Sequence, residues 1–197
     1  MLPAAFAWLH HPLTRNSAFM HLWAGQTAAQ VGFQVGTLAT SAIAITLLHA
    51  SETQIGVLSA LQTVAFLLVG LPAGAWVDGW CKRQVMIAAD VARIGALVSI
   101  PVAYSLATLT LTHLMIVSAL LGLCTVFFDV AYQSYVPIIA SKRYIGAANG
   151  RLEASYQVGH AGGPGLGGWL LGFVAPPLVY LLTALTYALS TWAIWRI

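Results

Sequence analysis

Charged side chains are scarce in this chain of 197 residues. Lysine and arginine number 8 and aspartate and glutamate number 5, so charged residues make up 7% of the sequence, against roughly 25% in ordinary soluble domains. Hydrophobic residues make up 59%. This balance excludes an ordinary soluble domain. It predicts an integral membrane protein, with membrane lipid among its partners.

Several functional motifs are absent as well. We find no G-x-x-x-x-G-K-[ST] sequence, so direct use of ATP by this chain is unsupported. Neither G-x-S-x-G nor H-E-x-x-H occurs, and we therefore predict no catalytic residue. The histidines lack ligand spacing, so no metal site is predicted. Cys81 falls in a loop and Cys124 in a helix, and we expect no disulfide between them.

The uncharged runs are long enough to cross a membrane. The run between Glu52 and Asp78 has 25 residues and that between Glu153 and Arg196 has 42, whereas one span needs about 20 apolar residues. After a cytoplasmic segment, 1-18, turn signals divide the transmembrane domain 19-197 into six predicted helices: 19-49, 55-77, 85-108, 112-136, 147-175 and 178-195. The predicted fold class is an all-α membrane protein, a six-transmembrane-helix bundle. The last helix is apolar almost throughout, and we expect it to face lipid.

The basic residues lie at one set of helix ends. Segments 51–54, 109–111 and 176–177 contain neither lysine nor arginine. The other ends carry Arg15, Lys82, Arg83, Lys142, Arg143 and Arg196. The positive-inside rule therefore predicts a multi-pass protein of the cell (inner) membrane with both termini in the cytoplasm. The net charge of +3 follows from this bias and gives no argument for a nucleic-acid partner.

Glycines follow a regular spacing in the predicted helix 147-175. The pattern G-x8-G-x3-G-P-x2-G-G consists of Gly150, Gly159, Gly163, Pro164, Gly167 and Gly168. Gly159, Gly163 and Gly167 fall at i, i+4 and i+8, so they form one smooth groove that a neighbouring helix can approach closely. Pro164 removes a backbone donor and adds a bend.

A second motif spans the end of the predicted helix 55-77 and the loop that follows it. Gly74, Asp78, Lys82 and Arg83 match the sequence G-x-x-x-D-R-x-G-R-K, which is the loop motif of the major facilitator superfamily. Gly79 replaces the usual arginine of that motif and Cys81 the usual glycine. The glycine-proline pattern resembles the antiporter motif of drug-exporting members. On these two motifs the chain resembles a major facilitator transporter.

Three phrases are most similar to the branch that contains enterobactin exporters and macrolide efflux proteins. They are residues 74–78, 89–93 and 127–132. The resemblance covers the amino-terminal six-helix half of a twelve-helix protein, and it implies that the half consists of 3+3 inverted repeats.

Polar side chains mark a substrate cavity on two predicted helices. Gln26, Gln30 and Gln34 recur every four residues, which would be costly against lipid, so they either line the cavity or form hydrogen bonds between helices. The helix 112-136 carries a mixture of aromatic and polar residues that suits an amphipathic molecule: Phe128, Asp129, Tyr132 and Gln133.

Asp129 is predicted to be the deepest carboxylate. Burial would favour its protonated form and make it the candidate for proton coupling; the alternative is a structural ion pair with Arg93. A second group of charges lies near the cytoplasmic face. Asp90, Arg93, Arg151 and Glu153, with the loop motif, either form a gate of ion pairs that break during transport or anchor helix ends.

These features predict a secondary active transporter that exports an amphipathic small molecule by alternating access. Its antiport would be driven by an ion gradient, which we expect to be one of protons, with no bound cofactor. Its expected partner is a second six-helix half or a second copy in a homodimer. One alternative is a transport-incompetent fragment or an assembly module that needs a second half, with its glycine groove exposed to lipid unless a partner covers it. Another is a six-helix intramembrane enzyme.

Overall fold

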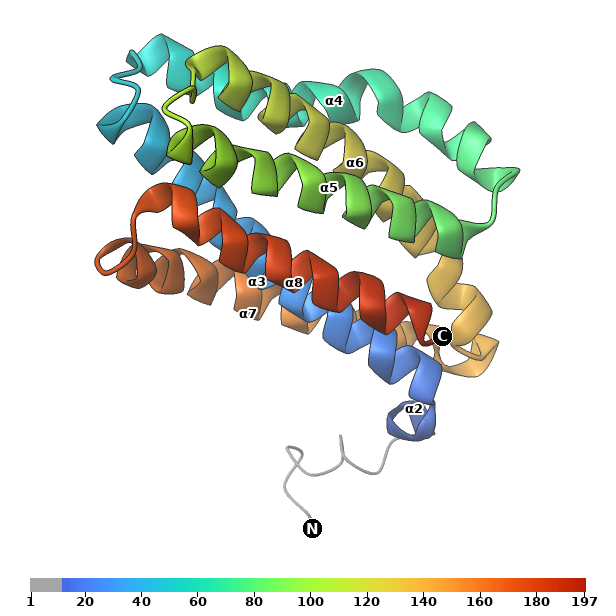
Figure 1. Ribbon diagram of the computed structural model, residues 1–197. Coiled ribbons are helices and arrows are strands. Elements are labelled where there is room, and N and C mark those ends of the chain that lie inside the picture. The colour runs from blue at the N-terminus through green and yellow to red at the C-terminus, as the bar shows by residue number, and fades with distance from the viewer. Residues whose placement is uncertain (1–11) are drawn as a thin grey trace.

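The computed structural model describes residues 12–197, a part of the chain that contains helices and no strands (Figure 1). A short helix, α2 (Pro12–Arg15), precedes six long ones, and a 3-10 turn (Lys142–Tyr144) precedes the fifth of these. The long helices are α3 (Ser17–Thr46), α4 (Glu52–Asp78), α5 (Lys82–Ser105), α6 (Leu111–Ile139), α7 (Ile145–Leu171) and α8 (Pro176–Trp195). Each begins and ends within four residues of its predicted range. Residues 1–11 of the predicted segment 1-18 lie outside the described residues.

Local capping explains where several helices begin. The Asn16, Ser51 and Thr110 side chains each accept a hydrogen bond from the backbone N–H three residues later, at the starts of α3, α4 and α6. At α4 the Gln54 side chain also accepts from the Ser51 N–H at 2.9 Å, which completes a capping box. Segment 51–54, which we placed between two predicted helices, therefore forms the N-cap and the first turn of α4.

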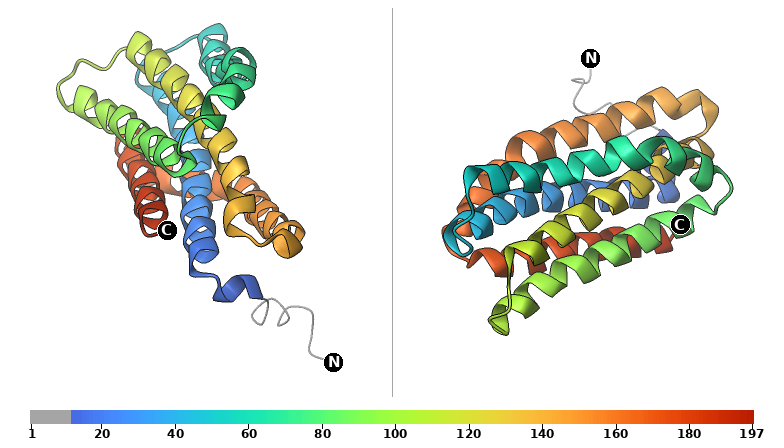
Figure 2. Two further views of the ribbon diagram at one scale, coloured as in Figure 1. Left: turned by 90° about the vertical axis from the view of Figure 1, so that its right-hand side faces the viewer. Right: turned by 90° about the horizontal axis from the view of Figure 1, so that it is seen from above.

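The long helices pack in the order α4, α6, α5, α8, α3, α7. The extensive contacts are α4 with α6, α6 with α5, α5 with α8, α8 with α3 and α3 with α7. The helices α4 and α7, at the two ends of this series, lie on one side of the bundle, and α5 and α8 on the other (Figure 2, left). This order leaves α4 and α7 with one extensive neighbour each.

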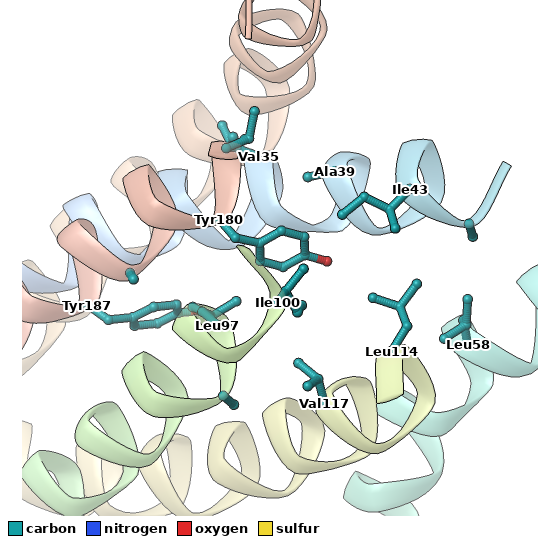
Figure 3. Close-up of a cluster of buried hydrophobic side chains, with 14 of the residues drawn as sticks. Val35, Ala39, Ile43, Leu58, Leu97, Ile100, Leu114, Val117, Tyr180 and Tyr187 are labelled. Carbon is teal, nitrogen blue, oxygen red and sulfur yellow. The ribbon is translucent and has the colours of Figure 1, made fainter. Parts of the chain in front are cut away.

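Two buried apolar clusters hold the bundle together. In the first, Tyr180 and Tyr187 of α8 lie beside Leu97 and Ile100 of α5 (Figure 3). The Tyr180 hydroxyl forms a hydrogen bond with Thr40 of α3, so its polar end is satisfied inside the core. The second cluster lies nearer the chain termini and includes Phe19, Met86 and Phe128. Both clusters join helices that are far apart in the sequence.

Five of the long helices, α3, α4, α5, α6 and α8, are long and apolar enough to cross a membrane. The sixth, α7, has 27 residues, as α4 does, but its glycines and polar residues lower its hydropathy. Length and composition thus establish a multi-pass all-α membrane protein.

The last helix, which we expected to face lipid, has one exposed apolar face, with Leu185 and Leu189 about half exposed, and one buried face that packs on other helices. In the most apolar stretch of α8, 44% of the residues are buried, whereas in that of α4 only 6% are. The reason is close packing: Gly25, Gly32 and Gly36 of α3 face α8, where Thr183 and Thr186 fill the space that larger side chains would need. Apolar composition alone does not distinguish a lipid-facing surface from a helix-facing one.

The contact between α4 and α6 gives a first prediction. A Cβ atom at Gly122 would lie 2.8 Å from the Cα of Gln62 and 2.9 Å from its carbonyl oxygen, so Gly122→Ala must push α4 away from α6. We expect this variant to lose about 1–3 kcal/mol of stability, seen as a lower melting temperature in detergent. The control is Gly95→Ala, because a Cβ there meets no atom within 4 Å. Equal melting temperatures for both variants would contradict the described contact.

Candidate functional site

A cavity of about 590 Å³ lies between α3, α6 and α7, with side chains of α5 and α8 at its base. It exists because α6 and α7 make few contacts with each other, although α7 packs closely on α3. Its lining combines amides, hydroxyls, carboxylates and aromatic rings. This is the mixture expected of a site for an amphipathic organic molecule.

Most of the predicted cavity residues line this space, as do Arg93 and Glu153 from the predicted gate. The former are Gln26, Gln30, Phe128, Tyr132 and Gln133, together with Asp129. Gln34 is not among the lining residues, because its side chain packs against Gly163 of α7. Of the three glutamines on α3, Gln26 and Gln30 therefore line the cavity, whereas Gln34 belongs to the contact between α3 and α7.

Sequence reasoning missed the contributions of α7 and α8 to the cavity. Asn149, Glu153 and Tyr156 recur at i, i+4 and i+7 on α7, a spacing that could have identified a polar helix face. Ser155 at the rim accepts a hydrogen bond from the indole N–H of Trp23 at 2.8 Å and so joins α7 to α3. No periodic signal marks Tyr187, which reaches the cavity from α8.

The glycine groove of α7 contacts α3. A Cβ atom added at Gly159 would lie 3.3 Å from the Cγ of Gln30. One added at Gly163 would lie 2.5 Å from the Cβ of Gln34, and one added at Gly167 would lie 2.8 Å from the Cδ1 of Leu38. The groove is thus filled by a helix of the same chain, and the expectation that it would face lipid in an isolated half was wrong. The other glycines of the motif, Gly150 and Gly168, have open space around them, and Pro164 is exposed.

A buried ion pair lies beside the cavity. The Arg93 Nη1 donates to the Asp90 Oδ1 at 2.9 Å, and the two residues are 4% and 0% exposed. The guanidinium carbon also lies 4.8 Å from the ring centre of Phe128 and 5.0 Å from that of Tyr187. Arg93 is therefore held by one carboxylate and two aromatic faces. The alternative pair of Arg93 with Asp129 does not form within residues 12–197.

The loop motif anchors helix ends in this conformation. The Arg83 Nε donates to the carbonyl of Ile194 at 3.1 Å, and its Nη2 donates to that of Trp195. Arg83 thus caps the last turn of α8, where a cation also complements the helix dipole. Lys82 donates to the backbone carbonyl of Asp78 at 2.7 Å. No ion pair joins Asp78 to either basic residue in the described chain, and Arg151 lies outside the cavity lining.

A smaller, mainly apolar cavity of about 410 Å³ lies between the first half of α5 and the middle of α6. Cys81 and Cys124 both line it, although they belong to different elements, and both are free thiols. Trp80 and Phe127, whose rings stack with centres 6.3 Å apart, line the same space.

The groove can be tested by two substitutions that flank Pro164. Gly163→Leu places a side chain against Gln34, whereas at Gly165 a Cβ meets no atom within 4 Å. We expect Gly163→Leu to separate α3 from α7 and to destabilise the protein by about 1–3 kcal/mol or more, and Gly165→Leu to leave it unchanged. The measurement is the melting temperature in detergent, with expression in membranes as a second readout. If both variants matched the wild type, the groove would not be a close contact.

A family model described as a transmembrane secretion effector, of the major facilitator superfamily, matches residues 7–197. No curated protein matches the chain.

Proposed function

Because the chain belongs to the transmembrane secretion effector family of the major facilitator superfamily, a family of membrane transporters rather than enzymes, we propose that it exports amphipathic small molecules by alternating access. In this proposal it is the amino-terminal six-helix half of a secondary active transporter. It lies in the cell (inner) membrane with both termini in the cytoplasm. A proton gradient drives the transport, and no bound cofactor is needed. The observation that carries the proposal is the polar, aromatic cavity between α3, α6 and α7.

The pattern of helix contacts supports six spans in two three-helix repeats. Exchanging α3 with α6, α4 with α7 and α5 with α8 turns the contact of α3 with α8 into that of α6 with α5. It turns the contact of α3 with α7 into that of α6 with α4, and it leaves that of α5 with α8 unchanged. All the extensive contacts therefore obey one exchange rule, as expected for inverted repeats. In that scheme α7 is the counterpart of α4 and the sixth span.

The exposed surfaces of α4 and α7 support a second half. Leu71 of α4 is 90% exposed and Leu67 is 78% exposed, and on α7 Val158 and Trp169 are exposed as well. Both helices lie on the same side of the bundle (Figure 2, left). A second six-helix half, or a second copy of this chain, would cover this side. The alternative remains a fragment or assembly module that does not transport alone.

The cavity lies toward one end of α3 and α7 and the closed glycine groove toward the other, and this arrangement supports an inward-open state. The cavity begins at Asn149 and Glu153, near the helix ends that carry the basic residues and are predicted to be cytoplasmic. Further along the same face of α7, the glycine groove closes onto α3. The cavity would then be open to the cytoplasm and closed toward the outside, which is the state that loads an exported molecule.

Asp129 is the proposed proton carrier. It lines the cavity, and Arg93 is paired with Asp90 instead. We expect inside-out membrane vesicles that contain the protein to take up an amphipathic dye when a proton gradient is applied. Asp129→Asn should reduce this uptake to the level found with an uncoupler, because the variant cannot release a proton. Glu52→Gln, on the exposed first turn of α4, is the matched control and should transport normally. Full gradient-driven uptake by Asp129→Asn would exclude the role.

Pairing of halves is tested by cross-linking from α4. In a background without Cys81 and Cys124, we expect Leu71→Cys to form an oxidised adduct with a second copy or a complementary half in membranes. Ala73→Cys on the same helix is 0% exposed and should not react. A purely monomeric Leu71→Cys protein would argue for a fragment that does not transport.

A further inference from the structure

The charges that line the cavity do not balance. Three charged side chains contribute to the lining, namely Arg93, Asp129 and Glu153. The charge of Arg93 is opposed by Asp90, which lies directly behind it at 2.9 Å. Neither Asp129 nor Glu153 forms a salt bridge with a described residue, although the charge of Arg93 also acts on Asp129 from a longer distance. The local charge is therefore negative when both carboxylates are ionised, although the chain as a whole is basic.

The aromatic rings that line the cavity also favour a positively charged ligand. Phe33, Tyr132 and Tyr156 present rings to the cavity, and the faces of aromatic rings attract cations. The protein itself demonstrates this preference at the cavity base, where the flat, delocalised guanidinium of Arg93 lies over Phe128 and Tyr187. Two of the rings that line the cavity, those of Phe128 and Tyr187, thus already hold one organic cation.

An unsatisfied acceptor points in the same direction. The Gln26 Oε1 is buried at the cavity and has no hydrogen-bond partner within the described residues. A buried acceptor without a donor is costly, and a ligand N–H group would satisfy it once the Gln26 amide rotates to bring this oxygen to the cavity surface. An anion in the cavity would instead face two carboxylates, and it would have to compete with Asp90 for Arg93.

We propose that this cavity binds amphipathic organic cations in preference to anions or neutral molecules of the same shape. The claim that such cations are the exported cargo rests on the proposed transport function. The binding preference itself depends on the cavity in the present chain. Carboxylates supply the charge, aromatic rings cover the apolar surface of the ligand, and the glutamine amides line the polar edge.

Two ions of the same shape and opposite charge test the proposal. Tetraphenylphosphonium and tetraphenylborate are added to the 197-residue chain in nanodiscs, and the uptake by protein-free nanodiscs is subtracted. We expect saturable binding of tetraphenylphosphonium and weaker or no saturable binding of tetraphenylborate. Tighter or equal binding of tetraphenylborate, or no saturable binding of either ion, overturns the proposal.

Neutral variants locate the effect in the cavity. Asp129→Asn and Glu153→Gln should each weaken tetraphenylphosphonium binding by roughly three- to tenfold, because each removes one nearby opposite charge. Neither should weaken tetraphenylborate binding, whereas a misfolded variant would lose both ions. Glu52→Gln lies outside the cavity and should bind as the wild type does. If both cavity variants retained full affinity for tetraphenylphosphonium, the site of binding would lie elsewhere and the proposal would fail.

Transport and cation preference can fail separately. If tetraphenylphosphonium binds as described but energised vesicles transport no probe, the transport function fails and the cavity chemistry stands. If vesicles transport a neutral or anionic dye while tetraphenylphosphonium does not bind, the cation preference fails and the transport function stands.

Discussion

The close approach of α3 to both of its neighbours is the contact on which the rest of the bundle depends. On one side, glycines of α3 itself face α8; on the other, glycines of α7 face α3. Lipid tails are as apolar as the side chains, so helices in a membrane associate through such close packing rather than through burial from water. With α3 fixed between α8 and α7, the chain can leave a cavity where α7 diverges from α6.

The cavity also depends on how the buried charges are compensated. A charged arginine in this environment is costly unless it is paired, and Asp90 supplies the pair one turn earlier on α5. Phe128 and Tyr187 shield the remaining faces of the guanidinium. This arrangement gives Arg93 a salt bridge without Asp129, although the Arg93 Nε and the Asp90 Oδ2 stay buried without a hydrogen-bond partner. As a result, a carboxylate remains available in the cavity, whereas a pair between Arg93 and Asp129 would have used it.

Much of the helical framework could be predicted from the sequence because long uncharged runs and basic links are local signals. The start of α4 was missed by three residues, since Ser51 and Gln54 form a capping box rather than a link. The residues on α3 and α6 that line the cavity have visible periodicity. The partner of each surface, however, is set by tertiary packing: nothing local distinguishes Gln34, which contacts Gly163, from Gln30, which also reaches the cavity. The contribution of Tyr187 from α8 is non-local for the same reason.

One face of α7 carries both the polar residues of the cavity and the glycines of the contact, and this has a mechanical consequence. Because α7 has α3 as its single extensive neighbour, it can move relative to the bundle by breaking that one contact. Gly159, Gly163 and Gly167 present backbone rather than interlocking side chains, so the surfaces can separate without passing through a steric clash. By contrast, α8 is held by α3, by α5 and by the guanidinium of Arg83. In the proposed alternating access, the end closed by glycines is therefore the end that opens, and α7 moves while α8 stays with the core.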